Sequence, residues 1–230
     1  MAEFDRYEQR NGSIAAMVTN RISLICPLVC LAIVLVTLAI SAISPHDRLT
    51  WWLETAPVFI AIPLLLVTWK RFPLTPLLVI LITVHALILI LGAHYTYARV
   101  PLGDWVSSAL DWDRNHYDRL GHIAQGFVPA ILAREILIRT SPLRPGGWLF
   151  YLTVSVSLAF SAFYEMLEWW TAVIGGGKSE DFLGTQGDPW DTQWDMFLAM
   201  SGAIVAQLTL SRWHFRQMHR LGLVDSLNDP

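Results

Sequence analysis

Six apolar runs of about 20 residues dominate this chain. A helix of about 20 residues has the length needed to cross the hydrocarbon core of a bilayer. The runs lie at approximately 22–43, 52–69, 74–95, 120–138, 148–170 and 194–212. Charged residues make up 15% of the chain and the mean hydropathy is +0.44, whereas a soluble domain has roughly 25% charged residues. We therefore expect an all-α, polytopic membrane helix bundle with about six transmembrane helices.

The basic residues are unevenly distributed between the two ends of these runs. Lys and Arg are retained preferentially on the cytoplasmic side of the membrane. If both termini are cytoplasmic, 11 of the 16 Lys and Arg residues lie on that side. We therefore expect a cytoplasmic N-terminal segment at 1–21, a transmembrane domain at 22–212 and a cytoplasmic tail at 213–230. The first run follows a polar segment and shows no small-residue cleavage site after a short apolar core, so we interpret it as a retained anchor.

This orientation places the two long connections, roughly 96–119 and 171–193, on the periplasmic side of the inner membrane. Most of the Asp and Glu residues lie in these connections or in the adjoining helix ends. An acidic surface excludes nucleic acid as a natural partner, because nucleic-acid binding requires a basic surface. It favours membrane lipids together with a cation, or a lipid-linked substrate presented with one.

Three of the expected helices carry ionisable residues one turn apart at their outer ends. The pairs are Asp118 with His122, Glu165 with Glu168, and Asp191 with Asp195. Residues at these spacings share a helix face. Ionisable groups at membrane depth are costly and usually face a bundle interior or a water-filled cavity. We therefore expect these six side chains to form one polar site that opens to the periplasmic side.

Carboxylates combined with a single imidazole are a ligand set suited to a divalent cation. Oxygen-rich ligation favours Mg²⁺, Mn²⁺ or Ca²⁺, and Zn²⁺ or Fe²⁺ is also compatible. Facing helices that each supply such a pair are similar to the cores of carboxylate-bridged metal bundles. Two carboxylates on one face, such as Glu165 and Glu168, repel each other unless a proton or a cation is shared. We expect all six paired residues to be metal ligands.

Four further polar residues flank the pairs and are expected to contact a substrate. They are Arg114, Arg119, Gln125 and Asp188. Either arginine offers charged hydrogen-bond donors to an anionic headgroup. Gln125 continues the helix face of Asp118 and His122. Asp188 precedes the last helix and would serve equally well as its N-cap.

Two functions from different classes fit this site. The first is a metal-dependent hydrolase or transferase that acts on a lipid or lipid-linked headgroup. In it His122, Glu165 or Glu168 is the catalytic base, and water is the nucleophile because no Ser–His pair or reactive Cys lies in the site. The alternative is a cation- or proton-coupled transporter or ion-binding protein. The inner halves of the runs offer few polar residues and no inverted repeat is visible, which counts against transport.

A third interpretation needs no ligand. The same side chains would then form a structural polar cluster that fixes helix packing. Whether the chain is an enzyme therefore stays open at the level of sequence.

A family resemblance runs from His85 to Ala203, about half of the chain. It is carried by the segments VHALILILGAHYTYARVPLG, RNHYDRLGHIAQGFVPAILAREIL, SAFYEMLEWW and FLGTQGDPWDTQWDM. The chain resembles the YjdF family of predicted bacterial inner-membrane proteins, a domain of unknown function. This resemblance implies a multi-spanning inner-membrane protein and supplies no reaction. A fainter similarity, in the order Asp-x-x-x-His, Glu and Asp, links the chain to VanZ-like membrane proteins, although the segment GTQGDPWD departs from their pattern.

Overall fold

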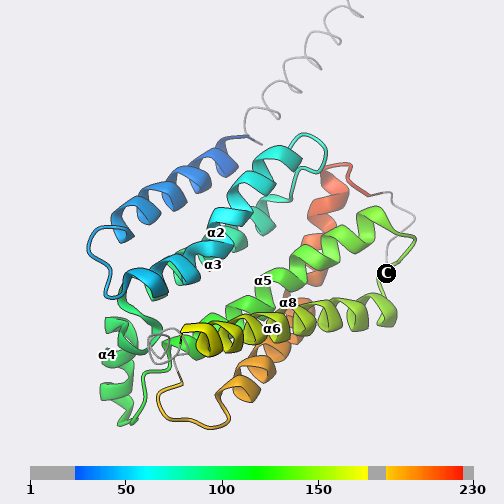
Figure 1. The fold of residues 1–230 in the computed structure, drawn as a ribbon. Helices are drawn as coiled ribbons and strands as arrows, with labels where there is room; N and C mark the ends of the chain where they lie inside the picture. The colour runs from blue at the N-terminus through cyan, green and yellow to red at the C-terminus, as the bar shows by residue number, and fades with distance from the viewer. Residues whose placement is uncertain (1–23, 176–184, 225–230) are drawn as a thin grey trace, which may run out of the picture.

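The computed structural model describes residues 24–175 and 185–224, and the regular structure in these ranges is helical (Figure 1). The helices are Leu24–Ser41, α2 (Arg48–Thr68), α3 (Pro76–Tyr95), the short 3₁₀ turn η1 (Tyr97–Arg99), α4 (Pro101–Leu110), α5 (Tyr117–Thr140), α6 (Gly147–Gly175) and α8 (Asp191–Arg220). The expected all-α class is confirmed for these residues. The expected N-terminal segment, 1–21, and residues 225–230 of the expected tail lie outside the described part of the chain.

Four helices are long and apolar enough to cross a membrane, namely Leu24–Ser41, α2, α3 and α6. The other two expected spans fall in α5 and α8, which have 24 and 30 residues. Both are long enough to cross, but their charged residues lower their hydropathy. More than half of the residues of α5 are buried by protein. The number of crossings and the side of the termini stay predictions.

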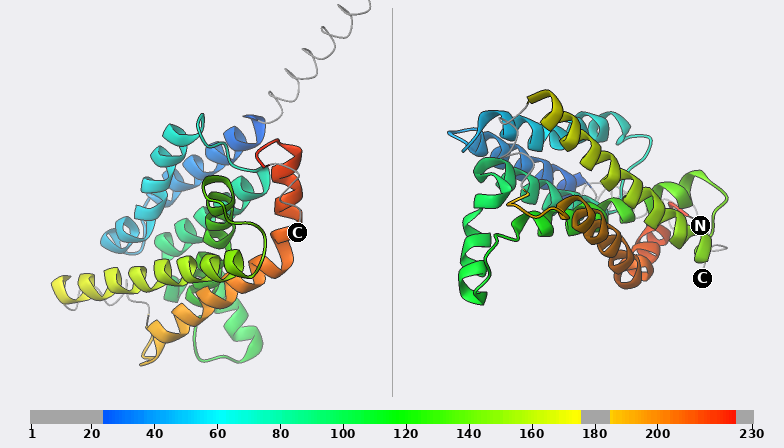
Figure 2. Two further views of the ribbon diagram at one scale, coloured as in Figure 1. Left: turned by 90° about the vertical axis from the view of Figure 1, so that its right-hand side faces the viewer. Right: turned by 60° about the horizontal axis from the view of Figure 1, so that its bottom comes forward.

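Helix α5 occupies the centre of the bundle. It contacts α3 on one side and α6 and α8 on the other, and its contact with α8 is the most extensive between any two helices (Figure 1). Figure 2 shows α6 and α8 crossing each other at an angle. The first turns of α5, the C-terminal half of α6 and the start of α8, which carry the three ionisable pairs, are therefore held together.

Glycines allow α5 and α8 to approach closely. A Cβ atom added to Gly126 would overlap the backbone of Ala199, and one added to Gly202 would overlap the backbone of Ile123. Small residues at such crossings let two helix backbones touch. Helix–helix association within a bilayer depends on this kind of packing, because lipid chains are as apolar as the helices themselves.

The N-terminal helix is attached to α2 and α3 through Ser41. Its hydroxyl accepts a hydrogen bond from Trp51 Nε1 at 3.1 Å, and its carbonyl oxygen lies 2.9 Å from His94 Nδ1. Asp47 caps α2 by accepting from the Thr50 amide at 2.7 Å, and the hydrogen bonds from Thr50 hold the pKa of this carboxyl below its usual value. Helices α2 and α3 thereby form one layer beside α5.

A second polar cluster joins α3, α5 and α8 at the end opposite the ionisable pairs. Glu135 accepts from Arg139 at 2.6 Å, from His214 Nε2 at 2.8 Å and from the Thr75 hydroxyl at 2.9 Å. Glu135 and His214 are fully buried. Because every oxygen of Glu135 is engaged, this carboxylate is satisfied within the bundle.

The close α5–α8 crossing predicts that an added methyl group lowers thermal stability at Gly126 but not at Gly147. Gly126→Ala should lower the melting temperature of the detergent-purified protein, because overpacking costs about 1–3 kcal/mol. Gly147→Ala should leave it nearly unchanged, since a Cβ there meets no atom within 4 Å. Thermal unfolding followed by circular dichroism measures both. Equal melting temperatures for the two variants would show that α5 and α8 do not touch at Gly126.

Candidate functional site

The three ionisable pairs meet at one end of the bundle. Asp118 and His122 lie in the first turns of α5, Glu165 and Glu168 in the C-terminal half of α6, and Asp191 and Asp195 in the first turns of α8. Each of the six is at most 9% exposed. Residues that are distant in sequence therefore form one buried cluster.

His122 lies at the centre of this cluster. Its Nε2 atom is 3.5 Å from Asp118 Oδ1 and 3.8 Å from Asp195 Oδ2. Its Nδ1 atom is 2.8 Å from Gln125 Oε1 and 3.8 Å from Glu165 Oε1. An amide oxygen only accepts hydrogen bonds, so Nδ1 carries a proton in this contact. In the neutral ring the Nε2 lone pair then points to the side of Asp118 and Asp195.

Two sets of three residues have donor atoms close enough for one metal ion. Asp118, His122 and Asp195 form the first set, and His122, Glu165 and Glu168 form the second. Within each set the donor atoms lie within 4.8 Å of one another. Ligand distances of about 2.0–2.2 Å to a small divalent ion require donors at roughly this separation after modest adjustment. Five of the six expected ligands belong to one set or the other.

Asp191, the sixth expected ligand, is engaged differently. Its Oδ1 accepts a hydrogen bond from Arg114 Nη2 at 2.5 Å. Arg114 also donates to the Thr185 carbonyl at 3.0 Å and lies 3.4 Å from Asp188 Oδ2. Arg114 thus connects the start of α5 to the segment that leads into α8, and Asp191 serves this connection.

The remaining residues expected to bind substrate lie at the rim or support the cluster. Arg119 Nη2 is 3.2 Å from Asp188 Oδ2, and its guanidinium lies 5.3 Å from the ring centre of Trp194. Asp188 is not the N-cap of α8, which begins after Trp190; it accepts from the Trp190 amide at 2.9 Å instead. Gln125 bonds to His122 inside the cluster. Arg114, Arg119 and Asp188 therefore form one ion-pair network.

Hydrogen bonds between two loops hold this ion-pair network in place. Asn115 donates to the Val100 carbonyl at 3.0 Å and to Asp104 at 2.7 Å. Its backbone exchanges two hydrogen bonds with the side chain of Gln186, at 3.1 and 2.8 Å. Helix α5 therefore starts at a fixed position relative to the segment before α8. Sequence reasoning gave no role to Asn115 or Gln186.

Glu54 is a further carboxylate at the site that the sequence analysis missed. It lies in α2, is 4% exposed, and accepts from the Tyr164 hydroxyl at 3.2 Å and from Tyr97. It interacts electrostatically with both Asp118 and Glu168. A single carboxylate within an otherwise apolar run is the signal that would have identified it.

Tyr97 reaches this carboxylate because the backbone around it is constrained. Thr96 has φ of +62°, a conformation that costs of order 1–3 kcal/mol for a residue other than glycine. The Tyr97 ring lies against Gly92 and Gly121, where a Cβ atom at either position would overlap it. The turn between α3 and α4 therefore places the Tyr97 phenol between α3 and α5.

The charges of the cluster do not balance. Six carboxylates are buried there, those of Glu54, Asp118, Glu165, Glu168, Asp191 and Asp195. Among the described residues, the basic groups within 4.0 Å of these carboxylates are Arg114 and the imidazole of His122. Glu165 Oε1 and Asp195 Oδ1 are buried without a hydrogen-bond partner among the described residues. Such orphaned oxygens call for a ligand, a proton or water.

Two comparisons place the chain among known proteins. The family described as "Predicted membrane protein (DUF2238)" matches residues 26–216. The chain is 52% identical over 184 residues to "Inner membrane protein YjdF" of Escherichia coli (strain K12), and the aligned part covers 80% of this chain and 88% of that protein. No solved structure matches. The chain therefore belongs to this family of predicted membrane proteins, as its motifs indicated, and is a multi-pass protein of the bacterial inner membrane.

Proposed function

We propose that the buried cluster binds a divalent cation and that the protein uses it for hydrolysis or transfer at a lipid or lipid-linked headgroup on the periplasmic side. The observation that carries this proposal is the convergence of four buried carboxylates, those of Asp118, Glu165, Glu168 and Asp195, on the imidazole of His122. Burying unpaired carboxylates is expensive, so this arrangement is stable only if protons or a cation share the charge.

Asp118, His122 and Asp195 are the preferred ligands. A neutral imidazole has one lone pair, and the hydrogen bond to Gln125 directs that lone pair toward the two aspartates. Gln125 then orients the ring in the way that outer partners of metal-bound histidines do. The set is rich in oxygen, which favours Mg²⁺, Mn²⁺ or Ca²⁺ and is compatible with Zn²⁺ or Fe²⁺.

A cation in this position would polarise a phosphoryl or acyl oxygen and activate water for attack. Glu165 is the preferred general base, because its Oε1 is unpartnered and lies 3.8 Å from His122. Glu168 is close enough to share a proton or a second cation with Glu165. Water remains the nucleophile.

An aromatic groove beside the cluster supports a lipid substrate. A groove of about 390 Å³ is lined by Trp190, Gln193, Trp194 and Phe197 at the start of α8. Trp194 precedes Asp195 in sequence and contacts Arg119. An apolar chain could lie in the groove while its headgroup reaches the cluster, and an anionic headgroup would replace Asp188 or Asp191 as the partner of Arg114 and Arg119.

Metal content tests the ligand assignment. The wild-type protein, incubated with each divalent ion and then desalted, should retain about one equivalent by elemental mass spectrometry. The variant with both Asp118→Asn and Asp195→Asn should retain none, because two of the three metal donors change from a charged carboxylate to a neutral amide. Asp113→Asn, which changes an exposed carboxylate on the same side of the protein, should behave as wild type. Wild-type protein that is folded but free of every ion would overturn the metal proposal.

Glu165→Gln separates catalysis from metal binding. The variant should keep its metal and lose about 10²–10⁴-fold in turnover, the usual contribution of a general base. Release of phosphate or fatty acid from phosphatidic acid, an isoprenoid phosphate and phosphatidylglycerol in mixed micelles measures the activity. Unchanged turnover in the variant would exclude Glu165 as the base. A metal-loaded wild-type protein that cleaves none of these lipids would overturn the enzymatic part of the proposal.

One observation favours the alternative, a cation- or proton-coupled transporter. Ser161, Ser157 and Thr153 continue the face of Glu165 along α6 toward the other end of the bundle, and all three are fully buried. The hydroxyls of Ser161 and Thr153 have no partner among the described residues. Polar groups therefore extend further inward than the sequence analysis expected. Buried polar tracks are typical of ion pathways, although small residues also serve close helix packing.

Flux measurements separate this alternative from lipid chemistry. Proteoliposomes that hold the wild-type protein should show a proton or cation flux if the track conducts, and replacing Ser157 and Ser161 by alanine should reduce it. The Asp113→Asn protein again serves as the control. The absence of flux from liposomes whose protein is folded and correctly inserted would reject transport.

A further inference from the structure

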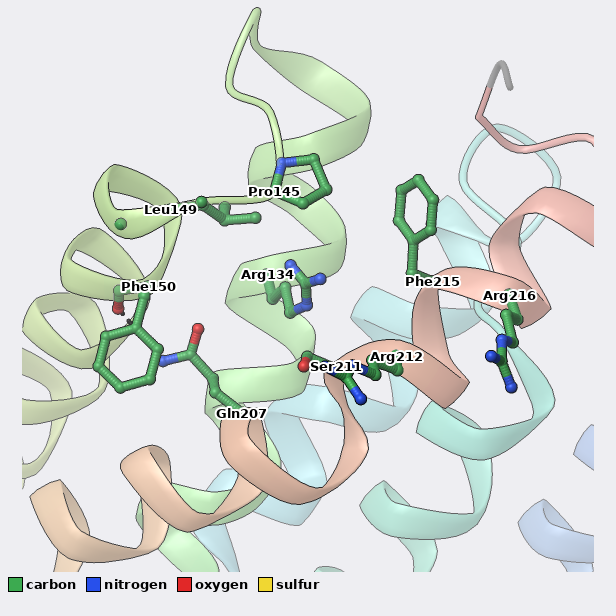
Figure 3. Close-up of a pocket in the computed structure, with 11 residues that line it drawn as sticks. Arg134, Pro145, Leu149, Phe150, Gln207, Ser211, Arg212, Phe215 and Arg216 are labelled. Atoms are coloured by element: carbon green, nitrogen blue, oxygen red, sulfur yellow. Dashed lines mark hydrogen bonds between the residues drawn. The ribbon is translucent and has the colours of Figure 1, made fainter. Parts of the chain in front are cut away.

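A second cavity lies at the opposite end of α5, remote from the acidic cluster. It has a volume of about 740 Å³ and lies between α5, the start of α6 and the second half of α8 (Figure 3). Its polar lining comprises Arg134, Gln207, Ser211, Arg212 and Arg216. Its apolar lining includes Leu149, Phe150 and Phe215. We call this cavity the arginine pocket.

Arg134 is the unusual member of the arginine pocket. Its side chain lies in the interior with Gln207 and Ser211 nearby (Figure 3), and the residue is only 5% exposed. Its Nε atom is buried without a hydrogen-bond partner in the described ranges, where no ion pair to this guanidinium is found either. A buried guanidinium without an anion carries a large desolvation cost.

No carboxylate among the described residues offsets this charge. None lines the pocket. Glu135, the neighbour of Arg134 in sequence, is already occupied by Arg139, His214 and Thr75. Arg212 and Arg216 are exposed and add two more positive charges at the mouth. The pocket therefore concentrates three guanidinium groups and lacks its anion.

We propose that the arginine pocket binds the phosphate of an anionic phospholipid headgroup. Arg presents several donors in a planar fork that matches phosphate oxygens. Gln207 and Ser211 add uncharged polar groups beside Arg134, and the phenyl rings of Phe150 and Phe215 offer apolar surface for the glycerol and upper acyl chains. Basic pockets between transmembrane helices are a known way of holding lipid headgroups at the cytoplasmic side.

The position of the pocket agrees with this occupant. Arg134 lies 16 residues after Asp118 in α5, a separation of roughly 24 Å along a helix. Trp148 and Trp213, which adjoin lining residues of the pocket in sequence, are 74% and 55% exposed, as expected of aromatic residues at headgroup level. The excess of basic residues at this end predicts the cytoplasmic leaflet, whose anionic lipids attract positive charge. The proposal is independent of the metal centre.

Lipid binding to the delipidated, full-length protein in detergent tests the proposal. Native mass spectrometry and thermal melting are recorded with phosphatidylglycerol, with zwitterionic phosphatidylcholine and with inorganic phosphate. The wild type should retain phosphatidylglycerol in preference to phosphatidylcholine and should melt at a higher temperature when it is bound. Arg134→Met should weaken phosphatidylglycerol binding by about tenfold or more, the effect of losing charge-assisted hydrogen bonds.

Two further variants control for misfolding of Arg134→Met and for the loss of net charge. Arg212→Gln changes an exposed lining residue, so it should fold normally and weaken lipid binding even if Arg134→Met does not fold. Arg220→Gln removes one exposed charge from the same helix outside the pocket and should bind as wild type. Arg134→Met should also melt at no lower temperature than wild type without lipid, because it removes an unpaired buried charge.

Three results would overturn the proposal. The first is equal retention of phosphatidylglycerol and phosphatidylcholine. The second is an equal loss in Arg220→Gln, which would indicate attraction by net charge alone. The third is tight binding of inorganic phosphate that phosphatidylglycerol does not displace, which would identify a free anion as the occupant in place of a lipid.

Discussion

The close contact of α5 with α8 is the constraint on which the rest of the molecule depends. Gly126 and Gly202 remove side-chain bulk at the crossing, so the two backbones touch. On one side of this crossing the start of α5 meets the start of α8, and His122 reaches Asp195. On the other side the same helix pair brings Glu135 to His214. Without the crossing neither polar cluster would form.

The two ends of the bundle handle charge in opposite ways. At the acidic end, the buried carboxylates in the described part of the chain outnumber the basic groups that contact them, and oxygens of Glu165 and Asp195 have no partner there. At the basic end, Glu135 is fully paired while Arg134 has no described partner. Within a bilayer, such unpaired charged groups are not solvated by water, because the surrounding hydrocarbon offers no hydrogen bonds. Each imbalance therefore points to its own complementary ligand, a cation at one end and an anion at the other.

Local spacing in the sequence predicted much of the site but not its long-range pairing. Pairs such as Asp118 with His122 follow from helical periodicity, since residues four apart share a face whatever the tertiary structure. The engagement of Asp191 by Arg114 joins residues 77 positions apart and has no periodic signature. Glu54 was missed because a single carboxylate forms no pair within its own helix. Hydropathy alone likewise separates α5 and α8 from the four apolar helices, because both carry more charged residues, and α5 buries most of its polar side chains against protein.

Helix α8 contributes residues to both the acidic cluster and the arginine pocket. Its 30 residues contain no proline and would extend about 45 Å. Asp195 lies near the start of this helix, and Gln207, Ser211 and Arg212 line the arginine pocket further along it. Because one continuous helix carries both linings, a ligand that shifted α8 at Asp195 would also shift the residues that line the arginine pocket. Binding at the two ends would then be thermodynamically linked, and each ligand would alter the affinity for the other by the same factor.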